Sequence, residues 1–235
     1  MRIAIIPARG GSKRIKNKNI VPLAGQPMIH YSLAAAKESR LFDKIHVSTD
    51  SEEIRNVVEN LGFPVDFLRT KELADDFTPI MPVLKWTLEQ FLKLGKPFDE
   101  VCLLMPTAPL LLADDLIGGH KTLLAHDRKK PALAVSVFPA PIEWAFNMDR
   151  DGSLVANQPE MLSKRSQDLT PKYFDTGMFC FFSGEQILKG RPPEEQTFVG
   201  HLLGRDRVVD IDTLDDLALA EALYLGRRER GKQAP

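Results

Sequence analysis

The chain of 235 residues contains 31 Lys and Arg residues and 32 Asp and Glu residues, which give a formal net charge of −1. This balance excludes a general polyanion-binding protein, which needs a basic surplus, and also an acidic solvating chain. With 43% hydrophobic and 27% charged residues, the composition is that of a globular protein rather than a disordered one. We therefore expect one large domain, with or without a small appendage.

The two cysteines, Cys102 and Cys180, lie in apolar runs that are typical of strands. They indicate reduced, buried thiols rather than a disulfide framework or a four-ligand zinc site. No apolar run approaches the roughly 18 residues of a membrane span, and the apolar stretch at the N-terminus is too short for a signal peptide. The sequence therefore predicts a soluble, cytoplasmic protein that has no membrane partner.

The first elements in chain order are a buried strand over residues 3–6, which Pro7 ends, and a basic loop with two glycines that extends to Asn19. Strands and helices then alternate. We expect a helix over 27–39, a strand over 44–48, a helix that ends near residue 60 and is capped by Asp50 or Ser51, a strand over 65–68, a helix over 82–94, a strand over 101–105, a helix over 112–125 and a strand over 133–137. This alternation predicts an α/β fold with a mostly parallel sheet, in which ligands lie beyond the carboxyl ends of the strands.

The pattern changes between residues 139 and 190, where prolines and aromatic residues interrupt it. We interpret this stretch as an irregular or antiparallel insertion. A strand over 208–211 and a helix from 214 to about 229 then return to the earlier pattern. The expected organisation is a core formed by residues 1–138 and 191–235, with the insertion over 139–190.

The loop that follows the first strand is the most informative segment of the sequence. Gly10 and Gly11 allow backbone amides to approach a ligand, and the Arg and Lys side chains of the loop can donate charge-assisted hydrogen bonds to phosphate. The loop lacks the Gly-Lys-Ser/Thr of a Walker loop and the G-x-G-x-x-G of a dinucleotide-binding fold. It therefore indicates a polyphosphate site of another kind, with a solvated basic turn as the alternative.

Asp210 and Asp212 stand near the end of the chain, in a stretch where acidic residues outnumber basic ones. At the end of a strand, residues i and i+2 project to the same face, so both carboxylates can meet one cation. Carboxylate oxygens suit Mg²⁺. The alternative is that Asp212 only caps the following helix.

Several motifs together resemble those of the acylneuraminate cytidylyltransferases, which load nonulosonic acids onto CMP. The signature residues are Ile6-Pro7-Ala8-Arg9-Gly10-Gly11-Ser12-Lys13 with Lys18-Asn19. Further matches are Ser48-Thr49-Asp50, Phe67-Leu68-Arg69, Leu73-Ala74-Asp75-Asp76 and Asp210-Ile211-Asp212. The run Arg165-Ser166-Gln167-Asp168-Leu169, followed by Tyr173-Phe174-Asp175-Thr176-Gly177, is most similar to the members that use pseudaminic acid.

The resemblance implies a three-layer Rossmann-like nucleotidyltransferase that uses CTP, a nonulosonic acid and Mg²⁺ or another divalent cation. Asn19 and Arg69 would read the cytosine, and the whole nucleotide site would consist of Ala8, Arg9, Gly10, Gly11, Ser12, Lys13, Lys18, Asn19 and Arg69. Sugar binding would fall to Arg165, Gln167 and Asp175, on an insertion that forms a homodimer and contributes to the partner's site. Asp210 and Asp212 match the metal ligands, and the expected catalytic set is Arg9, Lys13, Lys18, Asp210 and Asp212.

Two positions depart from the sialic acid synthetases of this family. Met105 stands where those enzymes carry a glutamine, and Leu111 stands where they have an arginine. A thioether cannot donate the hydrogen bonds of an amide, which favours pseudaminic acid over N-acetylneuraminic acid as the acceptor. Cytidylyltransferases for N-acetylneuraminate, legionaminate or 3-deoxy-octulosonate are alternatives, as is a non-catalytic nucleotide-binding module. A nucleic-acid binder is disfavoured, because the basic residues are confined to one loop that has no interleaved aromatic residue.

Overall fold

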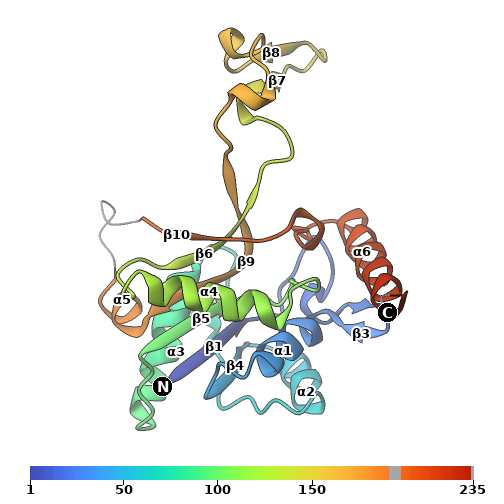
Figure 1. The fold of residues 1–235 in the computed structure, drawn as a ribbon. Coiled ribbons are helices and arrows are strands. Elements are labelled where there is room, and N and C mark those ends of the chain that lie inside the picture. Colours follow the sequence, from blue (N-terminus) through green and yellow to red (C-terminus); the bar gives the residue numbers. More distant parts are fainter. Residues whose placement is uncertain (191–196, 234–235) are drawn as a thin grey trace.

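The computed structural model describes residues 1–190 and 197–233. Residues 191–196 and 234–235, which belong to the expected second core segment, lie outside this part. Figure 1 shows a central sheet with helices on both sides and an arm that projects away from it. The predicted α/β fold with three layers is confirmed.

The central sheet has six strands in the order β10-β6-β9-β5-β1-β4. Strand β9 runs antiparallel to both of its neighbours, β5 and β6, whereas the other neighbouring strands are parallel. The sheet is therefore mostly parallel, as the alternation of strands and helices predicts. The strand bounds are β1 Arg2–Pro7, β4 Lys44–Ser48, β5 Glu100–Leu104, β6 Ala132–Val137, β9 Tyr173–Ser183 and β10 Val199–Leu202.

Helices cover both faces of this sheet. Ala4 and Ile6 of β1 point to the face covered by α1, α2 and α4, whereas Ile3 and Ile5 point to α3 and α5. Strand β1 is thus buried on both faces, which explains its continuous apolar run. The helix bounds are α1 Met28–Ser39, α2 Glu52–Asn60, α3 Ile80–Lys93, α4 Ala113–Ala125, α5 Gly184–Lys189 and α6 Leu214–Gln233.

Helix α6 packs against the glycine-bearing loop and against α1, where its Ala220 is buried with Ile15 and Met28. A small hairpin of β2 Pro22–Leu23 and β3 Gln26–Pro27 lies between the loop and α1. Among the helices within the described ranges, none combines the length and the apolar character needed to cross a bilayer.

Two of the strand predictions are wrong. Residues 65–68 and 208–211 form no strand in the described structure. Their apolar side chains, such as Val209 and Ile211, are buried without a neighbouring strand to pair with, so the apolar pattern reports burial alone. The apolar pattern of the sequence did not predict β10, the edge strand that pairs with β6 in parallel.

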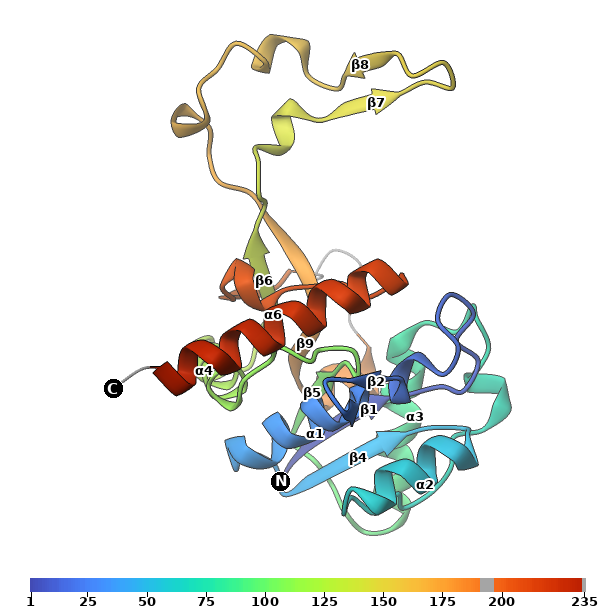
Figure 2. The ribbon, with the colours of Figure 1, turned by 90° about the vertical axis from the view of Figure 1, so that its right-hand side faces the viewer.

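The chain between β6 and β9, residues 138–172, forms the projecting arm, which Figures 1 and 2 show from two sides. A hairpin of β7 Phe146–Met148 and β8 Leu154–Ala156 lies near its far end. The expected insertion over 139–190 extends too far, because β9 and α5 return to the core. An antiparallel strand of the core has the same local pattern as a strand of an insertion, so the sequence could not separate the two.

Candidate active site

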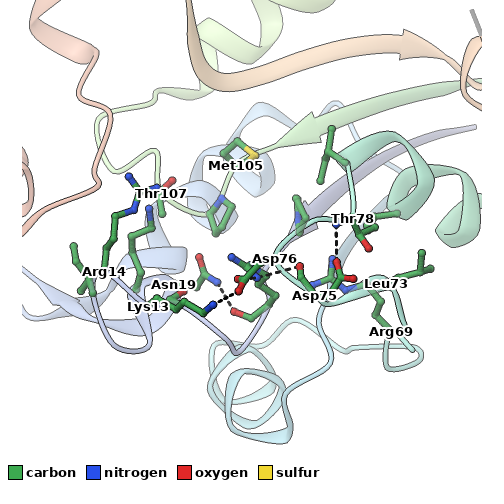
Figure 3. A pocket seen from close by; sticks show the side chains of 18 residues that line it. Lys13, Arg14, Asn19, Arg69, Leu73, Asp75, Asp76, Thr78, Met105 and Thr107 are labelled. Atoms are coloured by element: carbon green, nitrogen blue, oxygen red, sulfur yellow. Dashed lines mark hydrogen bonds and ion pairs between the residues drawn. The ribbon is translucent and has the colours of Figure 1, made fainter. Parts of the chain in front are cut away.

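A cavity of about 340 Å³, here termed the first cavity, opens at the carboxyl ends of β1 and β5. This is the edge of the sheet at which a ligand was expected. Figure 3 shows the side chains that line it, which come from the glycine-bearing loop, from residues 69–83 and from residues 105–107 after β5. The predicted nucleotide-binding residues that line it are Arg9, Ser12, Lys13, Lys18, Asn19 and Arg69.

The loop begins close to the sheet. Ala8 donates its backbone N–H to the carbonyl of Ser48 at 2.9 Å, and Gly10 donates to the Asp50 carboxylate at 3.0 Å. A Cβ on Gly10 would lie only 3.0 Å from the Cβ of Ser51, so this close approach favours glycine. The first turn of the loop is thereby held against the segment that follows β4.

The rest of the loop is anchored at its far end. Ile15 is buried together with Ile211, and Asn19 donates from Nδ2 to the carbonyl of Arg9 at 3.0 Å. A Cβ on Gly11, between these anchors, would meet no atom within 4 Å. The loop is therefore fixed at both ends, and its middle faces open space in which a ligand can approach the backbone.

Asp212 lies against the basic loop, although 194 positions separate it from Lys18. Its Oδ1 lies 3.2 Å from Lys18 Nζ, and its Oδ2 lies 2.5 Å from Arg14 Nη1. Helix α6 is capped instead by Thr213 and Asp216, whose side chains each accept the other residue's backbone N–H. The alternative in which Asp212 serves only as a helix cap is therefore wrong.

Asp210 and Asp212 lie just before α6 and not at a strand end, contrary to the sequence prediction. Ile211 between them is buried, whereas Asp210 is exposed and Asp212 is partly exposed. Neither carboxylate lines the first cavity, and only Asp212 is tied to it, through Arg14 and Lys18, which do line it. Carboxylate oxygens are donors that suit Mg²⁺, which commonly combines one or two of them with phosphate and water oxygens. Across residues 1–190 and 197–233, no group of three or more His, Cys, Asp or Glu residues is placed to hold a metal ion.

The segment of residues 71–79, here termed the strap, closes the other side of the first cavity. Arg9 Nη1 lies 2.5 Å from Asp76 Oδ1 and 3.1 Å from the carbonyl oxygen of Asp75, and Lys13 pairs with the same Asp76 carboxylate. The hydrogen bonds from Lys13 and Arg9 lower the pKa of Asp76. Sequence reasoning gave Asp76 no role, although its motif was part of the family resemblance.

Arg69 is buried at the first cavity, with 6% of its surface exposed. Its Nε and Nη2 atoms have no hydrogen-bond partner among the described residues, and Asp50 Oδ1 is 3.8 Å from Nη2, beyond hydrogen-bond distance. Burial lowers the pKa of this guanidinium. Because a buried charged group without acceptors is costly, the arrangement indicates that a ligand supplies them.

Arg165 and Gln167 are not among the residues that line the first cavity of their own chain. Both are exposed on the arm, and Arg165 donates from Nε and Nη2 to the Asp168 carboxylate at 2.8 and 3.0 Å. Asp175 lies in β9, on the wall of a second cavity of about 740 Å³, and its Oδ1 accepts the backbone N–H of Gly177 at 2.8 Å. The predicted sugar-binding residues therefore do not meet at one place within a single chain.

The second cavity adjoins the first, because Leu73 and Ile80 line both. Its walls include Trp86 and Phe182 and are largely apolar. Met105 lines the first cavity and is labelled in Figure 3. A cationic compartment and an apolar compartment thus lie side by side at one edge of the molecule.

Known proteins are similar to this chain in sequence and in fold. A family model described as cytidylyltransferase matches residues 3–95. The chain is 37% identical over 225 residues to the pseudaminic acid cytidylyltransferase of Campylobacter jejuni subsp. jejuni serotype O:2, an alignment that covers 94% of this chain and 95% of the relative. It is 33% identical over 231 residues to the CMP-N,N'-diacetyllegionaminic acid synthase of Legionella pneumophila subsp. pneumophila, with 95% and 96% coverage. The solved structure of CMP:2-keto-3-deoxy-manno-octonic acid synthetase complexed with CTP has the same fold, with a TM-score of 0.69 at 15% identity over 96% of this chain and 99% of that chain.

Proposed function

Because this chain belongs to the acylneuraminate cytidylyltransferase family and is an enzyme that transfers CMP from CTP to a nonulosonic acid, we propose that its acceptor is pseudaminic acid. The observation that carries the nucleotide part of the proposal is the buried Arg69, whose unpaired nitrogens lie at the same cavity as the cations of the glycine-bearing loop. A nucleotide would satisfy both groups, since its polar base offers acceptors for Arg69 and its phosphates carry the negative charge that the loop cations require.

In the proposed complex, Arg9, Lys13 and Lys18 bind the triphosphate, together with the hydroxyl of Ser12 and the backbone of Ala8, Gly10 and Gly11. Arg69 and Asn19 contact the cytosine. The burial of the side chains supports this assignment, because Arg9, Lys13 and Lys18 pair with carboxylates at the cavity, whereas Arg69 lines the same cavity but is buried. Arginine and lysine form charge-assisted hydrogen bonds to phosphate oxygens, which are stronger than neutral ones.

The reaction we propose is an in-line attack of the acceptor's anomeric hydroxyl on the α-phosphorus of CTP. The new P–O bond forms as the bond to the bridging oxygen of the β-phosphate breaks, pyrophosphate leaves, and the proton of the hydroxyl passes to water. Arg9, Lys13 and Lys18 would neutralise the charge that develops on the leaving group, so catalysis rests on positioning and electrostatics. Asp210 and Asp212 would hold Mg²⁺, which supplies further positive charge at the phosphates when it is bound.

The choice of pseudaminic acid rests on the apolar surroundings of the acceptor position. Met105 presents a thioether where the sialic acid synthetases of the family carry an amide, and the adjoining second cavity has apolar walls that include Trp86 and Phe182. Pseudaminic acid has a more apolar C9 end than N-acetylneuraminic acid and loses less hydration there. Asp175 lies on the same cavity wall and would accept hydrogen bonds from the polar part of the sugar.

We also propose a homodimer in which the arm of one chain reaches the partner's site. The hairpin on the arm exposes four large apolar side chains, which favours burial against another chain. These residues are Phe146, Met148, Leu154 and Val155. Arg165 and Gln167 are carried on the same arm, away from their own first cavity, and this arrangement supports their use in the partner's sugar site. We also propose a cytoplasmic location, where a buried thiol such as that of Cys102 stays reduced.

A pyrophosphate-release assay tests the proposal. The chain is incubated with CTP, Mg²⁺ and one acid from a panel of pseudaminic, legionaminic, N-acetylneuraminic and 3-deoxy-octulosonic acids. We expect the highest kcat/KM with pseudaminic acid. Absence of release with every acid, from folded protein, contradicts the transferase reaction, and a preference for N-acetylneuraminic acid contradicts the interpretation of Met105. In a thermal-shift panel of the four nucleoside triphosphates, CTP should stabilise most, because a ligand that binds the native state raises its stability.

A further inference from the structure

The strap places a carboxylate between two of the cations that the proposed function assigns to the triphosphate. Asp76 Oδ1 accepts a hydrogen bond from Arg9 Nη1 at 2.5 Å, and Asp76 Oδ2 pairs with Lys13 Nζ. Figure 3 shows Asp76 pointing toward Lys13, with a dashed line between them. A single side chain from the strap therefore engages both cations.

Hydrogen bonds within the strap hold its turn, while Arg9 Nη1 also donates to the backbone carbonyl of Asp75 at 3.1 Å. Asp75 Oδ1 accepts the backbone N–H groups of Phe77 at 3.0 Å and Thr78 at 2.6 Å, and Thr78 Oγ1 donates to the carbonyl of Glu72 at 3.3 Å. Phe77 is 89% exposed, so its side chain does not pack this turn against the core. Asp76 can therefore leave the cations without loss of the turn.

The ion pairs of Asp76 are exchangeable. The Asp76 side chain is 28% exposed and that of Lys13 is 79% exposed, and pairs with this access to water contribute little net stability. A phosphate oxyanion requires the same donors as the carboxylate. Since a triphosphate offers more charge and more acceptor oxygens than one carboxylate, it can replace Asp76 at both cations.

We propose that Asp76 is a positioning residue, an internal counter-anion that holds Arg9 and Lys13 at the first cavity until the triphosphate of CTP displaces it. This inference rests on the proposed nucleotide site. The same competition acts on the product, since Asp76 recaptures the two cations as pyrophosphate leaves. Asp76 therefore lowers the affinity for CTP and favours the release of pyrophosphate.

Replacement of Asp76 by asparagine tests the competition directly, because it removes the charge and keeps the size of the side chain. CTP is titrated calorimetrically into the full chain without acceptor, so that no turnover occurs. We expect Asp76→Asn to bind CTP about three- to tenfold more tightly than wild type, the effect of deleting one or two partly exposed ion pairs. The affinity for pyrophosphate should rise by a similar factor, whereas the affinity for cytidine, which lacks phosphate, should not change.

Steady-state kinetics give a readout that a merely structural role of Asp76 would not produce. In Asp76→Asn the KM for CTP should fall, and pyrophosphate should inhibit at lower concentration, while kcat does not rise. Asp76→Glu retains the carboxylate and should behave as wild type. Asp76→Ser also lacks the charge and should repeat the gain in affinity, which keeps the test available if the asparagine variant does not fold.

Asp75→Asn is the matched control, because it removes a charge from the neighbouring residue, whose carboxylate accepts hydrogen bonds from the strap's own amides. It should leave the Kd for CTP within about twofold of wild type, because the asparagine oxygen can still accept those hydrogen bonds and the Asp75 carboxylate pairs with neither Arg9 nor Lys13. Equal or weaker CTP binding by the Asp76 variants overturns the inference, provided that wild type binds CTP. If wild type binds no CTP, the proposed function itself is wrong, and the two failures are thus distinguishable.

Discussion

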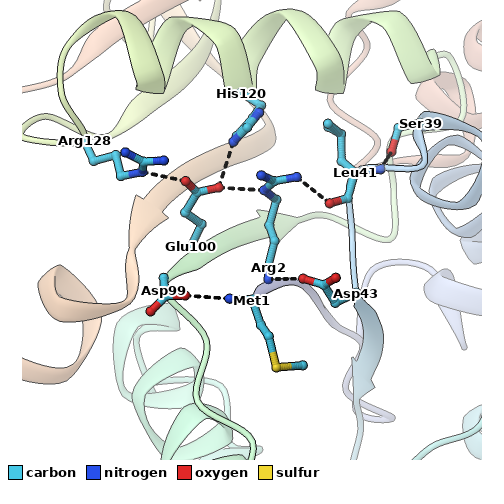
Figure 4. Close-up of polar contacts among 9 residues, drawn as sticks. All are labelled: Met1, Arg2, Ser39, Leu41, Asp43, Asp99, Glu100, His120 and Arg128. Carbon is cyan, nitrogen blue, oxygen red and sulfur yellow. Dashed lines mark hydrogen bonds and ion pairs between the residues drawn. The ribbon is translucent and has the colours of Figure 1, made fainter.

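Replacement of Glu100 by glutamine should destabilise the fold without a change in the active site. Glu100 is the first residue of β5 and pairs in register with Arg2 of β1, at the end of the sheet opposite to the first cavity. It is buried, with 4% of its surface exposed, and Figure 4 shows its carboxylate among three donors. Oε2 accepts from Arg2 Nε at 2.6 Å and lies 2.7 Å from His120 Nε2, and Oε1 accepts from Arg128 Nε at 2.5 Å.

The magnitude follows from the pKa of this carboxyl. Burial by itself raises the pKa of Glu100, but the hydrogen bonds from Arg2, Arg128 and His120 outweigh burial and lower it from 4.5 to about 2. At about 1.4 kcal/mol per pKa unit, the folded chain stabilises the carboxylate by about 3 kcal/mol. The Arg2 and Arg128 side chains are 26% and 50% exposed, so water can solvate them once the charge is removed. Because glutamine also keeps one acceptor oxygen, we expect a loss of about 2 kcal/mol.

Urea unfolding at neutral pH measures this loss, and its pH dependence checks the cause. The pKa of Glu100 is lower in the folded chain than in the unfolded chain. Its contribution to the free energy of unfolding is therefore complete above pH 4.5 and disappears as the pH falls towards 2. The difference between wild type and Glu100→Gln should shrink in that interval. Glu59→Gln, which removes an exposed pair with Arg55, should leave the midpoint unchanged. Equal midpoints of wild type and Glu100→Gln at neutral pH, or a difference that persists in acid, would refute the reasoning.

The remaining predictions concern the site and the arm. Asp212→Asn should abolish pyrophosphate release, because the proposed metal pair loses a charge, while circular dichroism and the thermal midpoint stay as in wild type. Arg69→Met should weaken CTP binding about tenfold or more in a calorimetric titration, yet it should not lower the thermal midpoint, because two buried guanidinium nitrogens lack hydrogen-bond acceptors among the described residues and the pair with Asp50 is long, at 3.8 Å. Met105→Gln should raise kcat/KM for N-acetylneuraminic acid relative to pseudaminic acid, since it supplies an amide. Met148→Asp combined with Val155→Asp should yield monomers in analytical ultracentrifugation, because both changes charge the exposed hairpin.

Each of these predictions has an outcome that contradicts it. Unchanged turnover in Asp212→Asn excludes a role in metal binding. A lower thermal midpoint in Arg69→Met indicates that the guanidinium stabilises the fold rather than the nucleotide complex. An unchanged acceptor preference in Met105→Gln removes the argument for pseudaminic acid from that position. A wild-type chain that sediments as a monomer contradicts the proposed homodimer before any hairpin variant is made.

Much of the fold could be predicted because local patterns report burial and chain direction. The apolar run over 3–6 is buried on both faces, Pro7 ends it, and the glycines that follow form a loop at the carboxyl edge of the sheet. The same patterns do not report pairing. Residues 208–211 are apolar and buried but pair with no strand, whereas 199–202 form the sheet edge. Burial depends on the residue itself, but pairing depends on which backbone donors and acceptors come near it.

The sequence by itself determined the chemistry of the site, and the tertiary structure decided which residues meet there. A net charge of −1 conceals a basic loop whose composition already indicates a polyphosphate. Its actual counter-ions, Asp76 for Arg9 and Asp212 for Lys18, lie 67 and 194 positions away. The burial of Arg69 without acceptors is likewise a property of the fold. Parallel strands bring loops from distant parts of the chain to one edge of the sheet, so these contacts arise from topology, which no local pattern encodes.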